Sequence, residues 1–291
     1  MKAAAFDYVR AESLTQALDF LTRFGGEAKL IAGGQSLVPM MAMRLARPAW
    51  LVDIDRLPAL KDVTVESRRI RMGAGVRQKD VEHGAGWQAA LPLVRKALRW
   101  VGHQQTRNRG TVGGSLAYAD PSAELPLACL VLGGVLHMES QSRGARSVAA
   151  NDFFLGPMVT AIAEDECLTA IDWPVWRSGR IGTSFEETAI RHGDFAMASA
   201  ACQLQLDGQG AVSALAMGLG GVSGTPLSFP ELAAQLIGQR LTPDMAKDVA
   251  HVAAAQCEPG NDMHAQAPYR RHLAAVLLER VLLNSAAEAA L

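Results

Sequence analysis

The sequence of 291 residues contains only four cysteines, and no two of them form a C-x-x-C motif. No H-x-x-x-H pair is present either. Iron–sulfur and zinc sites usually depend on such short spacings. We therefore expect no cluster and no metal site on this chain. Four reduced, mostly buried thiols are the simpler interpretation of Cys129, Cys167, Cys202 and Cys257.

Long apolar runs and an excess of charge are also missing. No stretch of 18 consecutive apolar residues occurs, and the first seven residues are charged too early for a secretory signal. The 28 Lys and Arg residues nearly balance the 29 Asp and Glu residues, for a net charge of −1. A nucleic-acid partner normally requires a basic surface. We expect a cytoplasmic protein with no membrane insertion and no nucleic-acid partner.

Several catalytic and nucleotide-binding motifs are absent. There is no G-x-S-x-G, no Walker A motif and no acid–base pair with an evident substrate role. The pair Gly73 and Gly75 lacks the third glycine of a Rossmann fingerprint. The glycine run at 218–224 has the wrong spacing and is followed by Thr225-Pro226, where a helix should begin. We expect no catalytic side chain on this chain.

Two Gly-Gly segments stand out instead, at 32–36 (AGGQS) and at 111–115 (TVGGS). Adjacent glycines allow close approach of a ligand to the backbone, and consecutive N–H groups can form an anion site. Each segment ends in a serine, whose hydroxyl adds a donor. Either segment alone is more simply explained as a tight turn. Together they favour a nucleotide with a pyrophosphate group.

The hydrophobic pattern predicts a mixed α+β protein. Ser13 and Gln16 form a capping-box pattern before a helix. A short strand at 29–32 enters the first Gly-Gly segment, and 63–65 with 69–73 alternate like a hairpin. From about residue 177 three strands and then helices follow, which predicts a smaller α+β domain with a three-stranded antiparallel sheet. We expect domains at 1–176 and 177–291.

Polar residues flank the second Gly-Gly segment. Asp120 lies in a turn and can accept hydrogen bonds from ribose or adenine donors. Glu124 can do the same, or it can serve as a first-turn acid of the next helix. Arg107 and Arg109 either neutralise phosphate, dock a partner protein or belong to a solvated face.

At these residues the sequence resembles a known family. The segments 29–41, 107–116 and 119–124 are similar to the FAD-binding medium subunit of the molybdenum hydroxylases, the xanthine dehydrogenase and carbon monoxide dehydrogenase family. Segments 152–154, 164–169, 193–196 and 269–273 extend the resemblance over the whole chain. It implies a two-subdomain FAD-binding domain of the vanillyl-alcohol-oxidase (PCMH) type, followed by the C-terminal domain.

The resemblance also implies the cofactor site. Both Gly-Gly segments would hold the FAD pyrophosphate, Asp120 and Glu124 would lie near the adenosine part, and Phe195 would cover the isoalloxazine. The residues expected to bind FAD are Lys29, Ile31, Ala32, Gly33, Gly34, Gln35, Ser36, Leu37, Thr111, Gly114, Ser115, Ala117, Asp120, Glu124, Leu168 and Phe195.

Partner subunits follow from the same resemblance. Molybdenum–molybdopterin would lie on a large subunit and [2Fe–2S] clusters on a small one, in a heterotrimer or its dimer. Electrons would pass from the iron–sulfur subunit to FAD and then to an external acceptor. The alternatives are a stand-alone flavin-dependent oxidase or dehydrogenase of the same fold, and a non-enzymatic nucleotide-binding module.

Overall fold

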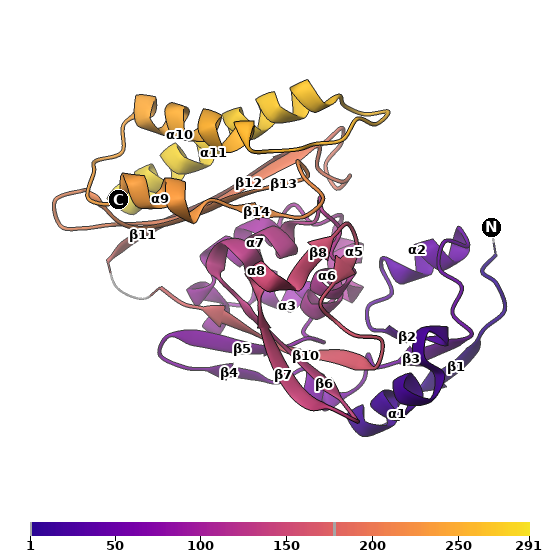
Figure 1. Ribbon diagram of the computed structural model, residues 1–291. Coiled ribbons are helices and arrows are strands. Elements are labelled where there is room, and N and C mark those ends of the chain that lie inside the picture. The colour runs from indigo at the N-terminus through magenta and orange to yellow at the C-terminus, as the bar shows by residue number, and fades with distance from the viewer. Residues whose placement is uncertain (1, 177–178) are drawn as a thin grey trace.

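The computed structural model describes residues 2–176 and 179–291, and the fold has three parts (Figure 1). A small N-terminal unit lies beside a larger middle unit, and a sheet with covering helices forms the C-terminal part. The predicted domain boundary adjoins Arg177 and Ser178, which lie outside the described residues. Within 2–176 and 179–291, no helix combines the length and apolarity needed to cross a membrane.

The N-terminal unit is a three-stranded parallel sheet in the order β1-β3-β2. Its strands are β1 (Asp7–Arg10), β2 (Ala28–Ile31) and β3 (Trp50–Asp53). Helix α1 (Leu14–Phe24) begins as the sequence predicts, because the Ser13 hydroxyl accepts a hydrogen bond from Gln16 N at 3.1 Å. Its apolar side packs on the sheet through Ala17, Leu18 and Leu21. Helix α2 (Leu37–Ala42) follows the first Gly-Gly segment.

The middle unit is built on a five-stranded antiparallel sheet in the order β4-β5-β10-β6-β7. Its strands are β4 (Val63–Val65), β5 (Arg69–Gly73), β6 (Val135–Ser140), β7 (Gly144–Ala149) and β10 (Glu166–Pro174). The helices beside it are α3 (Gln78–His83), α4 (Pro92–Leu98), α5 (Gln104–Arg109), α6 (Val112–Tyr118), α7 (Glu124–Leu132) and α8 (Ala150–Phe153). A two-stranded ribbon, β8 (Phe154–Gly156) and β9 (Val159–Thr160), completes it. Trp173 and Phe153 are fully buried in its core.

The C-terminal part is an antiparallel sheet in the order β11-β12-β13-β14. The strands are β11 (Arg180–Thr188), β12 (Ala198–Leu206), β13 (Val212–Gly220) and β14 (Leu227–Ser228). The helices are α9 (Pro230–Leu236), α10 (Pro243–Ala255) and α11 (Ala267–Ala290). Figure 1 shows α10 and α11 on the outer side of this sheet and α7 of the middle unit beneath it, which explains why β12 is buried along almost its whole length. The short β14 adds a strand to the three that the sequence predicts.

The sequence pattern favours irregular structure at 102–110 and loops at 152–157 and at the second Gly-Gly segment, and these three local predictions were wrong. The 102–110 stretch contains α5, and the 152–157 stretch forms parts of α8 and β8. The second Gly-Gly segment is not a loop but the first turn of α6. Glycine has a low helix propensity, so two adjacent glycines hide a helix that tertiary contacts and the Thr111 cap stabilise.

Candidate functional site

A cavity of about 650 Å³ lies where the three parts of the chain meet. Its walls come from the first Gly-Gly segment, from α6, from the 158–168 segment and from the 193–195 loop of the C-terminal part. The sixteen residues predicted to bind a cofactor all line this one cavity: Lys29, Ile31, Ala32, Gly33, Gly34, Gln35, Ser36, Leu37, Thr111, Gly114, Ser115, Ala117, Asp120, Glu124, Leu168 and Phe195. The fold therefore brings together residues that are more than 150 positions apart in the sequence, such as Lys29 and Phe195.

Gly33 of the first Gly-Gly segment packs against the backbone that directly precedes the second. A Cβ atom on Gly33 would lie 2.3 Å from the carbonyl oxygen of Arg109 and 2.9 Å from Cα of Gly110. Since both neighbours are backbone atoms, no larger residue fits here unless the first segment moves away from residues 109–110. Gly34 has a φ of 72°, a left-handed value that L-residues rarely adopt. Glycine is thus required at 33 for close approach and at 34 for conformation.

The first segment offers free backbone donors to the cavity. Among the described residues, the amides of Gly33, Gly34, Gln35 and Ser36 donate no hydrogen bond within the chain. Ser36 does not cap α2 with its side chain either, so its hydroxyl is also available. Consecutive unpaired amides that line one concavity fit an anionic group such as a diphosphate.

The second segment differs, and the prediction of two similar amide cradles was wrong in this respect. The amides of Val112 and Gly113 donate to Val76 O and Ala74 O, each at 2.9 Å. The amide of Gly114 donates to the Thr111 hydroxyl at 3.0 Å. A Cβ on Gly113 would lie 2.7 Å from Ala74 O. This segment contributes close packing and the Ser115 hydroxyl rather than free amides.

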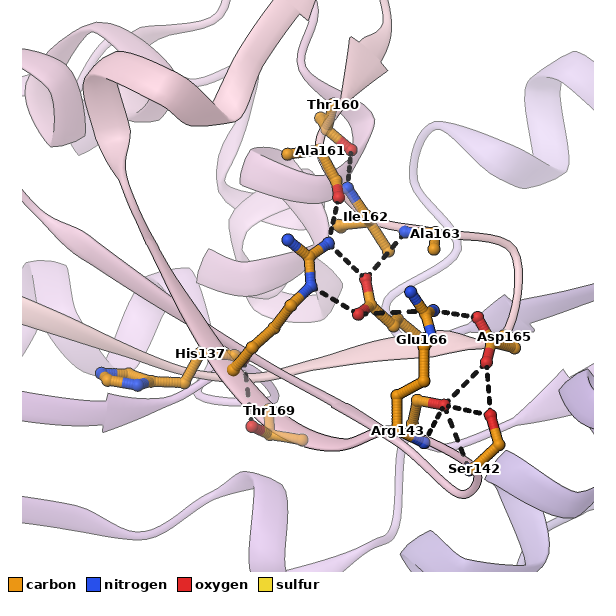
Figure 2. Close-up of polar contacts among 12 residues, drawn as sticks. His137, Ser142, Arg143, Thr160, Ala161, Ile162, Ala163, Asp165, Glu166 and Thr169 are labelled. Atoms are coloured by element: carbon orange, nitrogen blue, oxygen red, sulfur yellow. Dashed lines mark hydrogen bonds and ion pairs between the residues drawn. The ribbon is translucent and has the colours of Figure 1, made fainter.

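An ion-pair network fixes the 160–166 segment, which forms one wall of the cavity (Figure 2). The Glu166 carboxylate, whose side chain is 1% exposed, accepts hydrogen bonds from Arg146 Nε at 2.6 Å and Arg146 Nη2 at 2.7 Å. It also accepts one from Ala163 N at 2.8 Å. Beside it, Arg143 pairs with Asp165. Hydrogen bonds to the Asp165 carboxylate lower its pKa to about 2, and the bond from the Ser140 hydroxyl has the largest effect. Figure 2 shows these groups converging on the turn before β10.

Acidic side chains gather at the end of the cavity that faces the C-terminal part. The Asp120 carboxylate accepts a hydrogen bond from Ser122 N at 2.9 Å, and burial raises its pKa. Glu124 begins α7 and lines the cavity, so it is both a first-turn acid and a candidate ligand contact. Burial, with a smaller contribution from Asp120, raises the pKa of Glu124 to about 7.

Sequence reasoning missed Glu187 on β11. It is 7% exposed, and its Oε2 has no hydrogen-bond partner among the described residues. Burial first, and then the nearby Glu124, raise its pKa to about 9. A signal was present, because Phe185 and Glu187 lie two apart in a strand and so point to the same, buried face.

The predictions for Arg107 and Arg109 have separate outcomes. The Arg107 side chain is 11% exposed, and its Nε pairs with Glu82 Oε2 at 2.6 Å. Arg107 is therefore one member of an internal ion pair rather than a phosphate ligand or a solvated group. Arg109 is exposed, and its carbonyl accepts a hydrogen bond from Arg77.

Phe195 extends over the cavity from the loop between β11 and β12 and is 69% exposed. Gly193, with a φ of 89°, turns this loop. A Cβ there would lie 2.8 Å from the His103 ring, so the loop packs on the segment before α5. An exposed aromatic ring at a cavity mouth is suited to cover a planar ligand.

Two family models match the chain. Residues 4–176 match the model described as "FAD binding domain in molybdopterin dehydrogenase", and residues 183–285 match "CO dehydrogenase flavoprotein C-terminal domain".

Known proteins are similar over nearly their whole length. The alpha subunit of the 6-hydroxypseudooxynicotine dehydrogenase complex of Paenarthrobacter nicotinovorans is 35% identical, with 98% of this chain and 96% of that one aligned. The carbon monoxide dehydrogenase medium chain of Afipia carboxidovorans is 36% identical, with 99% of each covered. A solved carbon monoxide dehydrogenase chain from Hydrogenophaga pseudoflava superposes with a TM-score of 0.94 at 33% identity, covering 99% of both chains.

Proposed function

Because this chain belongs to the FAD-binding medium chains of the carbon monoxide dehydrogenase and xanthine dehydrogenase family, we propose that it is the electron-transfer flavoprotein subunit of a molybdenum hydroxylase. It receives electrons from an iron–sulfur subunit and passes them to an external acceptor. The partners are a small [2Fe–2S] subunit and a large molybdopterin subunit, in a heterotrimer or its dimer. The relatives named as a complex subunit and as a medium chain support this assembly.

The observation that carries the proposal is the cavity with free amides at Gly33 to Ser36. These donors, with the Ser36 and Ser115 hydroxyls, fit a pyrophosphate, and the rest of the cavity lining comes from all three parts of the chain. FAD supplies one- and two-electron chemistry when it is bound. The chain's own residues bind and orient it, and the Phe195 ring limits access of water to one end.

The elements that supply the lining suggest a direction for the cofactor. We infer that Lys29 and Ile31 of β2, with Leu168 of β10, hold the adenosine part. Phe195 comes from the C-terminal part, and Pro121 contacts the same part, because its carbonyl oxygen accepts a hydrogen bond from Gly221 N at 2.8 Å. Asp120 directly precedes Pro121, so we assign Asp120 and Glu124 to the isoalloxazine end rather than to the adenosine end that the resemblance implies.

We also propose the domain boundary between residues 176 and 177, in the interval between the two matched family models.

A cytoplasmic location completes the proposal. It is supported by the four cysteines, which are all free and buried, as in proteins of reducing compartments.

The test is to purify the chain both alone and with its co-expressed partner subunits. We expect the flavin absorption bands in both preparations, and turnover of a molybdenum-hydroxylase substrate with an artificial acceptor only in the complex. Turnover by the isolated chain would support the stand-alone oxidase instead. A freshly isolated complex without flavin would contradict the FAD assignment.

The ion-pair network that fixes the 160–166 segment gives a second prediction, about FAD affinity. Arg146→Met removes both bonds from Arg146 to the buried Glu166 carboxylate and leaves it with the Ala163 amide at 2.8 Å and the more distant Arg143 at 3.5 Å. Removing the main partner of a buried charge costs more than the net value of the pair. We expect FAD to bind about tenfold more weakly, which corresponds to about 1.4 kcal/mol, by titration of the deflavinated complex. The matched control is Arg143→Met, because Arg143 is half exposed and pairs mainly with Asp165. Equal losses in both variants would contradict a specific role for Arg146.

A further inference from the structure

Arg270 is a buried cation to which the proposed function assigns no role. It lies in the first turn of α11, is 7% exposed, and belongs to the segment 269–273 noted in the sequence. Burying a guanidinium is unfavourable unless its donors are satisfied. Its hydrogen-bond partners therefore indicate what it holds.

The guanidinium joins three segments of the C-terminal part. Arg270 Nη1 donates to Met197 O at 2.6 Å and to Gly221 O at 3.3 Å. Arg270 Nη2 pairs with Asp262 Oδ2 at 2.6 Å. Asp262 is itself fixed, because its other oxygen accepts bonds from His264 N and Ala265 N, each at 2.9 Å. The planar fork of arginine suits such a multi-point contact, whereas lysine offers a single point charge.

Both carbonyls belong to segments that adjoin residues of the cavity wall. Met197 is the last residue of the loop that carries Phe195, and it follows Phe195 by two positions. The amide of Gly221 donates a hydrogen bond to Pro121 O at 2.8 Å, and Pro121 directly follows Asp120. The two segments also touch each other, since a Cβ on Gly221 would lie 3.0 Å from Ala196 O. One side chain thus fixes the backbone behind both Phe195 and Asp120.

We propose that Arg270 is a positioning residue that sets the Phe195 loop and the Asp120 turn against the isoalloxazine of FAD. This inference rests on the proposed function, because it requires FAD in the cavity with its ring at the Phe195 end. Arg270 does not line the cavity and acts only through these two segments.

The test uses the whole complex, deflavinated and then titrated with FAD or with ADP. ADP contains the adenosine and pyrophosphate parts but no ring, so it reports the other end of the site. For Arg270→Met we expect FAD to bind about tenfold more weakly, or about 1.4 kcal/mol, while ADP affinity stays within about twofold. We also expect a shifted midpoint potential of the remaining bound flavin. Arg270→Lys should recover part of the FAD affinity.

The matched control is Arg271→Met, because the neighbouring Arg271 is exposed and, within the described part of the chain, donates only to Cys257 O at 3.0 Å. It should leave both affinities and the potential unchanged. Equal losses of FAD and ADP binding in Arg270→Met, or an unchanged FAD affinity and potential, would overturn the inference while leaving the proposed function intact. Absence of flavin from the wild-type complex would instead overturn the proposed function.

Discussion

Gly33→Ala is expected to weaken FAD binding by at least about a hundredfold, or about 2.8 kcal/mol, in the purified complex. The added methyl group would lie 2.3 Å from Arg109 O, well inside van der Waals contact. Backbone cannot rotate away as a side chain can, so the first Gly-Gly segment must separate from the backbone at 109–110, directly before the second segment. That separation moves the free amides of the first segment relative to Ser115.

Flavin content per chain, from the visible absorption of the purified complex, measures this loss. Gly208→Ala is the matched control, because no atom of residues 2–176 or 179–291 lies within 4 Å of its added methyl group. Thermal unfolding of the deflavinated chain separates lost binding from lost folding. Full flavin occupancy in Gly33→Ala would show that the close contact of Gly33 with residues 109–110 is not needed for the cofactor.

The second large effect is a loss of folding stability as the pH rises. The pKa of the Glu187 carboxyl is raised by burial from an unfolded value of 4.5 to about 9. Between those values the folded chain holds a proton that the unfolded chain has released, so stability falls as pH rises. The steepest slope from one such proton is about 1.4 kcal/mol per pH unit. Glu124, with a pKa of about 7, adds to the slope at lower pH.

Glu187→Gln keeps the shape of the neutral acid and has no proton to lose. We therefore expect the variant to unfold at a higher denaturant concentration than the wild type at about pH 8, and to match it near pH 5. Urea titrations of the FAD-bound chain over this range provide the measurement. Glu186→Gln, one residue away on the less buried face of β11, is the control. Parallel pH profiles for wild type and Glu187→Gln would refute a protonated Glu187.

Features encoded in short segments were predictable from the sequence. The Ser13 cap depends on a residue three positions away, and the hairpin of β4 and β5 follows from alternation over a few residues. The members of the cavity were identified through the resemblance, whose segments are also short. The residues expected to bind FAD do line one cavity.

Features that depend on distant partners were not predictable. Arg107 looked like a surface or phosphate-binding group because its partner Glu82 lies in another helix. The amides of α6 are used by Val76 and Ala74, whose proximity the second segment does not reveal. Glu187 is buried on β11, a strand that packs against the distant helices α4 and α11. In each case the tertiary contact, not local propensity, determined the role.

The three-part construction of the cavity has a consequence for cooperativity. A ligand that contacts all three parts stabilises their docked arrangement by mass action, in addition to each part by itself. Unfolding of any one part then requires release of the same ligand, which couples hydrophobic cores that are otherwise separate. The cofactor would thus act as a cross-link of the native state, and the flavin-loaded chain would unfold as one unit.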